Sequence, residues 1–130
     1  MVPAPPALRG TVVHGDGRGR ALGFPTANLR LREEALPADG IYAATATVEG
    51  SDETFLAVVS VGTNPTFPGE RDRRVEVHLL DADRDLYGAQ LIVELRRLLR
   101  GTIAFANEAA LIEQSAHDVR RCRELLTAAD

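Results

Sequence analysis

Residues 42–61 have the sequence Tyr-Ala-Ala-Thr-Ala-Thr-Val-Glu-Gly-Ser-Asp-Glu-Thr-Phe-Leu-Ala-Val-Val-Ser-Val. Two runs with many β-branched residues, 42–48 and 54–61, flank the segment Glu49-Gly50-Ser51-Asp52. Because β-branched side chains favour extended backbone and glycine favours turns, this stretch predicts a β-hairpin. A hairpin near the middle of the chain favours an antiparallel fold.

Further strands are predicted on both sides of this hairpin. Residues 8–14 and 90–98 each contain a run typical of a strand. Residues 74–80 alternate, so that one face carries Val75, Val77 and Leu79 and the other carries Glu76, His78 and Leu80. The aspartate-rich segment 81–85 between the last two runs predicts a turn.

The sequence period changes after residue 107. Asn107 is a suitable N-cap, and apolar or small residues then recur every three or four positions, as expected for one amphipathic helix. The predicted packed face comprises Leu111, Ile112, Ser115, Val119, Cys122 and Leu126. The residues predicted to point away from it are Glu113, Asp118, Arg120 and Glu124.

This order of elements predicts a mainly β fold. Five or six short strands followed by one helix, without alternation of strands and helices, favour an antiparallel barrel with the helix on its outside. We expect residues 1–8, which contain three prolines, to form a flexible N-terminal segment and residues 9–130 to form a single domain.

The composition of the chain argues against several functional classes. All fifteen basic residues are arginine and nineteen residues are acidic, giving a net charge of −4, which disfavours nucleic-acid binding. The absence of lysine excludes a P-loop lysine and a Schiff-base nucleophile. No apolar run reaches the roughly 20 residues of a membrane span, and a single cysteine favours a reducing compartment. A cytoplasmic protein without a membrane partner is expected.

Residues 15–23 form a glycine-rich segment with two interpretations. Backbone amides of such a segment approach anions closely, so it is a candidate phosphate-binding loop, although it matches no P-loop or dinucleotide pattern. Glycine clusters also serve simply to turn the chain. The candidate nucleotide contacts are Gly15, Gly17, Gly19, Arg20 and Gly23.

Three polar residues are further candidates. Thr26 and Asn28 follow the glycine segment and offer the oxygen ligands that Mg²⁺ prefers, but they also suit a capped turn. Glu76 lies in the middle of a predicted strand, where it is either solvated or a general base for a substrate hydroxyl. Neither Ser60 nor Ser115 has a recognisable triad partner.

Several segments in order resemble the riboflavin kinase family. Residues 10–29 contain Phe-Pro-Thr-Ala-Asn-Leu directly after the glycine-rich segment. The resemblance continues through Leu-Pro-Ala-Asp-Gly-Ile-Tyr-Ala at 36–43, Gly-Thr-Asn-Pro-Thr-Phe at 62–67 and Val-Glu-Val-His-Leu-Leu-Asp at 75–81. It ends with Asp-Leu-Tyr-Gly at 85–88 and covers nearly the whole chain after residue 9.

The resemblance implies a six-stranded Greek-key β-barrel that transfers the γ-phosphate of ATP to the 5′-hydroxyl of riboflavin, with ADP and FMN as products. It implies that Thr26 and Asn28 hold Mg²⁺ with the nucleotide, that Glu76 is the catalytic base, and that the glycine-rich segment with Arg20 contacts the phosphates. Flavin contacts are then expected at Arg100, Phe105 and Asn107. In many bacteria the family domain is fused to an FMN adenylyltransferase domain, which is the expected partner.

Two alternatives belong to other functional classes. A non-catalytic flavin- or nucleotide-binding module of the same fold would have no need of a base at Glu76. A regulatory domain acting on RNA would need a basic surface or stacking aromatics, and the chain has six aromatic residues and no tryptophan.

The chain also differs from the family after Arg100, because members commonly carry a charged Glu-Lys element where this sequence has Gly-Thr-Ile-Ala.

Overall fold

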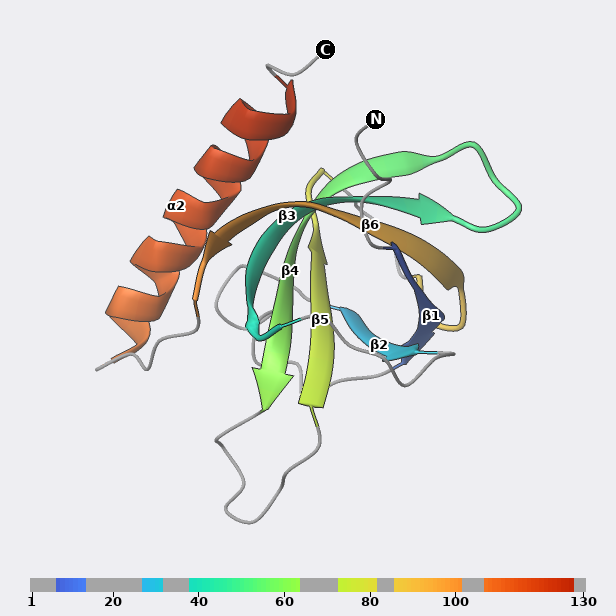
Figure 1. Ribbon diagram of the computed structural model, residues 1–130, viewed down its shortest axis with the longest axis horizontal. Coiled ribbons are helices and arrows are strands. Elements are labelled where there is room, and N and C mark those ends of the chain that lie inside the picture. The colour runs from blue at the N-terminus through green and yellow to red at the C-terminus, as the bar shows by residue number, and fades with distance from the viewer. Residues whose placement is uncertain are drawn as a thin grey trace.

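The computed structural model describes residues 7–13, 27–31, 38–63, 73–81, 86–101 and 107–127. These residues form six strands and a C-terminal helix that lies along the outside of the sheet (Figure 1). The elements are β1 (Ala7–Val13), β2 (Ala27–Leu31), β3 (Gly40–Val48), β4 (Thr54–Thr63), β5 (Arg73–Leu79), β6 (Gln90–Arg100) and α2 (Glu108–Thr127).

The strands form a closed antiparallel barrel in the order β1-β2-β5-β4-β3-β6, with β6 pairing back onto β1. Strands β3, β4 and β5 follow one another as a meander, and β6 returns to lie beside β3. This return is the Greek-key connection. The predicted fold class, a six-stranded antiparallel barrel with a C-terminal helix, is therefore confirmed.

The central hairpin is also confirmed. Strands β3 and β4 pair along their length, for example Tyr42 with Val59 and Thr47 with Thr54. Gly50 has a φ of 84°, which an L side chain rarely adopts, and the amide of Ser51 donates to the Val48 carbonyl at 3.0 Å. The glycine therefore allows the tight reversal that the sequence predicted.

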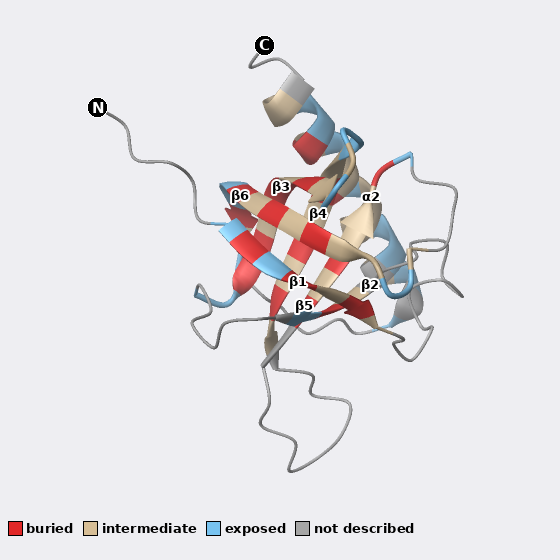
Figure 2. Ribbon diagram, turned by 90° about the vertical axis from the view of Figure 1, so that its right-hand side faces the viewer, coloured by how far each residue is buried: buried red, intermediate tan, exposed pale blue. Residues whose placement is uncertain are grey.

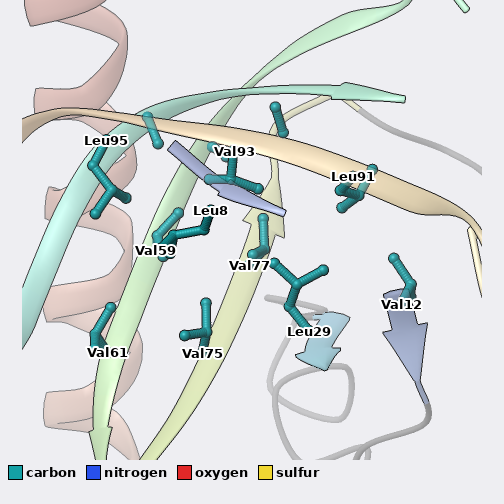
Figure 3. Close-up of a cluster of buried hydrophobic side chains, with 13 residues drawn as sticks. Leu8, Val12, Leu29, Val59, Val61, Val75, Val77, Leu91, Val93 and Leu95 are labelled. Carbon is teal, nitrogen blue, oxygen red and sulfur yellow. The ribbon is translucent and has the colours of Figure 1, made fainter. Parts of the chain in front are cut away.

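The barrel interior is filled by the inward-facing side chains of every strand (Figure 3), so buried positions alternate with half-buried or exposed ones along the ribbon (Figure 2). Most are valine, leucine or alanine, which pack closely without polar atoms that need partners. The cluster consists of Leu8, Val12, Leu29, Ala44, Ala46, Ala57, Val59, Val61, Val75, Val77, Leu91, Val93 and Leu95.

Strand β2 was not predicted as a strand from the sequence pattern. It pairs with β1 on one side and with β5 on the other, so a five-residue segment is held by two ladders. A Cβ atom at Gly10 of β1 would overlap the Arg30 carbonyl and the Leu29 side chain. Glycine at this position therefore lets β2 approach β1 closely.

Strand β6 contributes to two hydrophobic clusters. Its residues Leu91, Val93 and Leu95 point into the barrel, whereas Leu99 belongs to a cluster on the outer face beneath α2. The β3–β6 register shifts between Ala43 and Ala44, and an irregularity of this kind changes which face the following residues occupy.

The outer cluster docks the second half of α2 onto the barrel. Its buried members are Ile41, Ala43, Leu80, Leu99 and Cys122, and partly buried Leu56, Val58, Val119, Leu125 and Leu126 pack against them. The position of Ile112 on the predicted packed face is wrong, since this residue is 38% exposed and, among the described side chains, the helix members of the cluster begin at Val119. No helix in the described part of the chain is both long and apolar enough to cross a bilayer.

Polar contacts fix α2 in place around this cluster. Arg121 donates to the Leu99 carbonyl at 3.1 Å, and Arg123 pairs with Asp81 at 2.8 and 3.0 Å. The hydrogen bonds and charge of Arg123 hold the pKa of Asp81 below its ordinary value. The Cys122 thiol lies 3.3 Å from the Ala57 carbonyl, and burial raises its pKa.

Candidate active site on the outer face of the barrel

Asn28 of β2 and Glu76 of β5 are directly opposite each other in the antiparallel ladder. Opposed residues share a face of the sheet, with Cβ atoms about 4.5–5.5 Å apart. Glu76 lies between Val75 and Val77, which are 2% and 1% exposed and point into the barrel, so its carboxylate projects from the outer face. The fold therefore brings together a carboxamide and a carboxylate from segments far apart in the sequence.

This outer row continues onto the next strand. Ser60 of β4 is the direct partner of Glu76 on the side away from Asn28, and it lies between the buried, inward-facing Val59 and Val61. Sequence reasoning did not assign Ser60 to the site. Alternation along β4 could have placed it on the outer face, but only the β4–β5 register shows that it stands beside Glu76.

The environment of Asn28 fits a bound cation or a ligand that donates a hydrogen bond. Its side-chain oxygen Oδ1 is buried and has no hydrogen-bond partner among the described residues. Leaving a buried acceptor unpaired costs about 1–3 kcal/mol, so such an atom calls for a functional explanation. The alternative in which Asn28 caps its own turn is wrong, because Asn28 lies within β2 and is paired on both sides.

The donor set in this region is one that suits Mg²⁺ better than a transition metal. Among the described residues there is no group of three or more His, Cys, Asp and Glu side chains that could hold a metal. A hard cation that keeps several waters and shares substrate phosphates needs only one or two protein oxygens. The amide oxygen of Asn28 can supply one of them.

Arg100 lies elsewhere on the same outer row. The register runs from Glu76 to Ser60, then to Ile41 of β3 and Arg100 of β6, which is three strand spacings or about 14 Å along the sheet. The intervening Ile41 is 8% exposed and packs beneath α2. The structure therefore does not place Arg100 beside Glu76.

Arg100 instead binds α2. Its guanidinium donates to both carboxylate oxygens of Asp118, with nitrogen–oxygen distances of 2.8–3.3 Å, and to the Gly101 carbonyl at 3.1 Å. Gln114 donates to the same carboxylate at 3.0 Å. The prediction that Asp118 points away from the packed face is wrong, since it is only 4% exposed. A helical period cannot reveal a cationic partner on a distant strand.

Asn107 caps the helix, as predicted. Its side-chain oxygen accepts a hydrogen bond of 2.9 Å from the amide of Ala110, which satisfies one of the unpaired amides of the first turn. The remaining predicted contacts lie outside the described residues. They are Gly15, Gly17, Gly19, Arg20, Gly23, Thr26 and Phe105. Of these, Thr26 is the second predicted metal ligand beside Asn28.

Comparison with known proteins identifies the family of this chain. The family model named Flavokinase and described as riboflavin kinase matches residues 2–126. The chain belongs to the riboflavin kinase family.

A curated relative and two solved structures illustrate the similarity. The bifunctional riboflavin kinase/FMN adenylyltransferase of Escherichia coli (strain K12) is 43% identical over 120 residues, covering 92% of this chain and 38% of the relative. The crystal structure of riboflavin kinase from Trypanosoma brucei has a TM-score of 0.65 at 26% identity, covering 98% of this chain and 83% of its own.

A Streptococcus pneumoniae crystal structure described as a macrolide-efflux protein has a TM-score of 0.81 at 38% identity, and 92% of this chain and 38% of that chain are covered. This chain thus spans a little over a third of the curated bifunctional relatives, 38% in the Escherichia coli and Listeria monocytogenes proteins. The family match over residues 2–126 is to riboflavin kinase, which is one of the two activities in the names of those relatives.

Proposed function

We propose that this chain is a riboflavin kinase that transfers the γ-phosphate of ATP to the 5′-hydroxyl of riboflavin, with the domain spanning residues 9–130. Family membership gives the reaction class. The observation that supports the chemistry best is the opposition of Asn28 and Glu76 on the outer face of β2 and β5. A ligand for the nucleotide side and a base for the acceptor side then stand one strand apart.

Glu76 acts on the acceptor alcohol in this proposal. Its carboxylate accepts the proton of the 5′-hydroxyl while the hydroxyl oxygen forms a bond to the γ-phosphorus. The bond from that phosphorus to the β–γ bridging oxygen breaks, and ADP leaves with the electron pair. Because Glu76 is held in a strand between two buried valines, the carboxylate is positioned before the substrate arrives.

Asn28 serves the nucleotide side, together with Thr26 as the family resemblance implies. Mg²⁺ held by these two residues would neutralise charge on the nucleotide phosphates. The orphaned Oδ1 of Asn28 fits this role, because a ligand there supplies the partner that the fold leaves out. Backbone amides of the glycine-rich segment and Arg20 are proposed to bind the phosphates, since the chain has no lysine to do so.

Arg100, Phe105 and Asn107 are the residues proposed for the flavin side of the site. Arg100 and Asn107 both have structural partners within the chain, so we propose that they shape the flavin side of the site through those contacts. The second activity in the relatives' names, adenylyl transfer to FMN, is proposed to require an adenylyltransferase domain as partner. A cytoplasmic location remains the expectation from the single cysteine.

One assay tests the proposed reaction. The protein is incubated with riboflavin, ATP and MgCl₂, and the flavins are separated by chromatography, with a parallel sample containing excess chelator. We expect FMN and ADP in equal amounts with the metal and little FMN with the chelator. Absence of FMN across several metals and triphosphates, with riboflavin binding retained, would favour the non-catalytic module instead.

A further inference from the structure

Ser60 stands on one side of Glu76 and Asn28 stands on the other. Adjacent strands lie about 4.8 Å apart, so the three outward side chains form a short polar row across β2, β5 and β4. Ser60 is half-buried and its neighbours Val59 and Val61 fill the core, so its hydroxyl is fixed on the same outer face as the carboxylate.

If the proposed function holds, the phosphoryl donor lies at the Asn28 end of this row and the acceptor at the Ser60 end. Asn28 marks the side of the phosphoryl donor, because its unpaired oxygen is the group suited to the nucleotide-bound cation. In phosphoryl transfer the attacking and leaving oxygens lie roughly in line, on opposite sides of the transferred phosphorus. With the donor over β2 and the base on β5, the acceptor alcohol has to extend over β4, where Ser60 is located.

On the β3 side of Ser60, α2 covers the outer face of the sheet. The partner of Ser60 on β3 is Ile41, which is buried beneath α2. An acceptor that runs along the row from Glu76 therefore passes Ser60 and then has to leave the sheet surface at the helix. The residue at position 60 is thus the last strand side chain of this row that a bound polyol chain can reach.

We propose that Ser60 is a specificity-determining residue that hydrogen-bonds the acceptor hydroxyl adjacent to the one that is phosphorylated. For riboflavin this is the 4′-hydroxyl of the ribityl chain, so the inference rests on the proposed function and extends it. A serine hydroxyl both donates and accepts, which suits a second hydroxyl. The contact selects a vicinal diol over an isolated primary alcohol.

The first test compares Ser60→Ala with the wild type and with Thr54→Val. Thr54 is exposed on the same strand and distant from Glu76, so its variant controls for loss of a β4 hydroxyl. A lost hydrogen bond corresponds to about a three- to tenfold increase in the riboflavin KM. We expect that increase in Ser60→Ala alone, with kcat and the ATP KM changed by less than about twofold.

The second test removes the substrate partner of the contact. With 4′-deoxyriboflavin, the wild type should show the same increase in KM, and Ser60→Ala should show no further increase. An equal additional loss in the variant would overturn the inference, as would an unchanged riboflavin KM in Ser60→Ala. A fall in kcat without a change in KM would also overturn it, because that result assigns Ser60 to positioning Glu76.

Riboflavin binding provides a measurement independent of turnover. Quenching of flavin fluorescence, recorded with ADP and MgCl₂ present, gives Kd for both flavins and all three proteins. The same pattern of differences is expected in Kd as in KM. A wild type that binds riboflavin with this pattern but makes no FMN would reject the proposed kinase activity while supporting the role of Ser60, so the two failures are distinguishable.

Discussion

Asn28 and Glu76 face each other across the β2–β5 ladder, although the central hairpin of β3 and β4 lies between β2 and β5 along the chain. The two side chains come from continuous strands of a closed barrel and not from neighbouring loops. Strand backbone holds side chains more rigidly than loops do, so the distance between the two groups changes little as substrates bind. Substitutions at these positions should therefore affect function more than folding.

Asn28→Ala should weaken magnesium-dependent ATP binding without lowering the melting temperature. The variant removes a buried Oδ1 that has no hydrogen-bond partner in the described structure, so no bond to that oxygen is lost. Titration calorimetry with ATP, with and without Mg²⁺, measures the effect, and Thr26→Ala is expected to behave alike. Arg30→Ala, on the exposed side of the same strand, is the control. Equal ATP affinity in Asn28→Ala and wild type would remove Asn28 from the ligand set.

Glu76→Gln should lower kcat by roughly 10²- to 10⁴-fold while riboflavin and ATP still bind. Glutamine keeps the size of the side chain but does not accept a proton at neutral pH. A half-buried outward side chain contributes little to the core, so the free energy of unfolding should change by about 0.5 kcal/mol or less. Steady-state kinetics and thermal melting are measured on the same preparation. Wild-type turnover in this variant would exclude Glu76 as the base.

Asp118→Asn should destabilise the protein by about 3 kcal/mol. Arg100 is 20% exposed and Asp118 5% exposed at the side chain, and removing one partner of a buried pair leaves the other charge uncompensated. Asp81→Asn breaks a second described ion pair, between α2 and the turn after β5, but that pair is exposed, so it should have little effect. Urea denaturation of both variants measures the difference. Similar stability of the two would show that the Arg100–Asp118 pair adds nothing.

Cys122 should react with thiol reagents only when α2 leaves the barrel. Its side chain is fully buried, and burial raises the pKa of the thiol, so the reactive thiolate is scarce at neutral pH. Because the folded-state pKa lies above that of the unfolded chain, the stability linked to the neutral thiol is present below about pH 8.5 and is lost as the pH rises. Labelling by a chromogenic disulfide across pH and urea concentration measures this, and fast labelling in native buffer at neutral pH would contradict it.

The sequence predicted most elements because their patterns are local. The alternation of Val75, Glu76 and Val77 placed the carboxylate on the outer face, and the run from Asn107 gave both the cap and the helix. Both features depend on residues only a few positions apart. The strand boundaries differ from the predicted ones by one or two residues at the ends.

Features that depend on distant partners were not predictable in the same way. Strand β2 has only five residues and owes its extended form to ladders on both sides, so its own pattern was too short to identify it. Burial of Asp118 depends on Arg100, which lies on a different element. The register that sets Ser60 beside Glu76 is a tertiary property, because shifting a strand by one residue reverses its faces.

The pairing of β1 with β6 closes the barrel, and during translation this pairing has to wait until β6 has been synthesised. Across this seam Gln90 donates a hydrogen bond of 2.7 Å to Thr11, and the two residues are 79 positions apart. At about 5–20 residues per second the ribosome adds the partner strand roughly 4–16 seconds after β1. The β3–β4 hairpin is local and forms within microseconds of its emergence. Until β6 emerges, therefore, one edge of β1 is left open, and this interval is when a nascent chain is most exposed to wrong pairing.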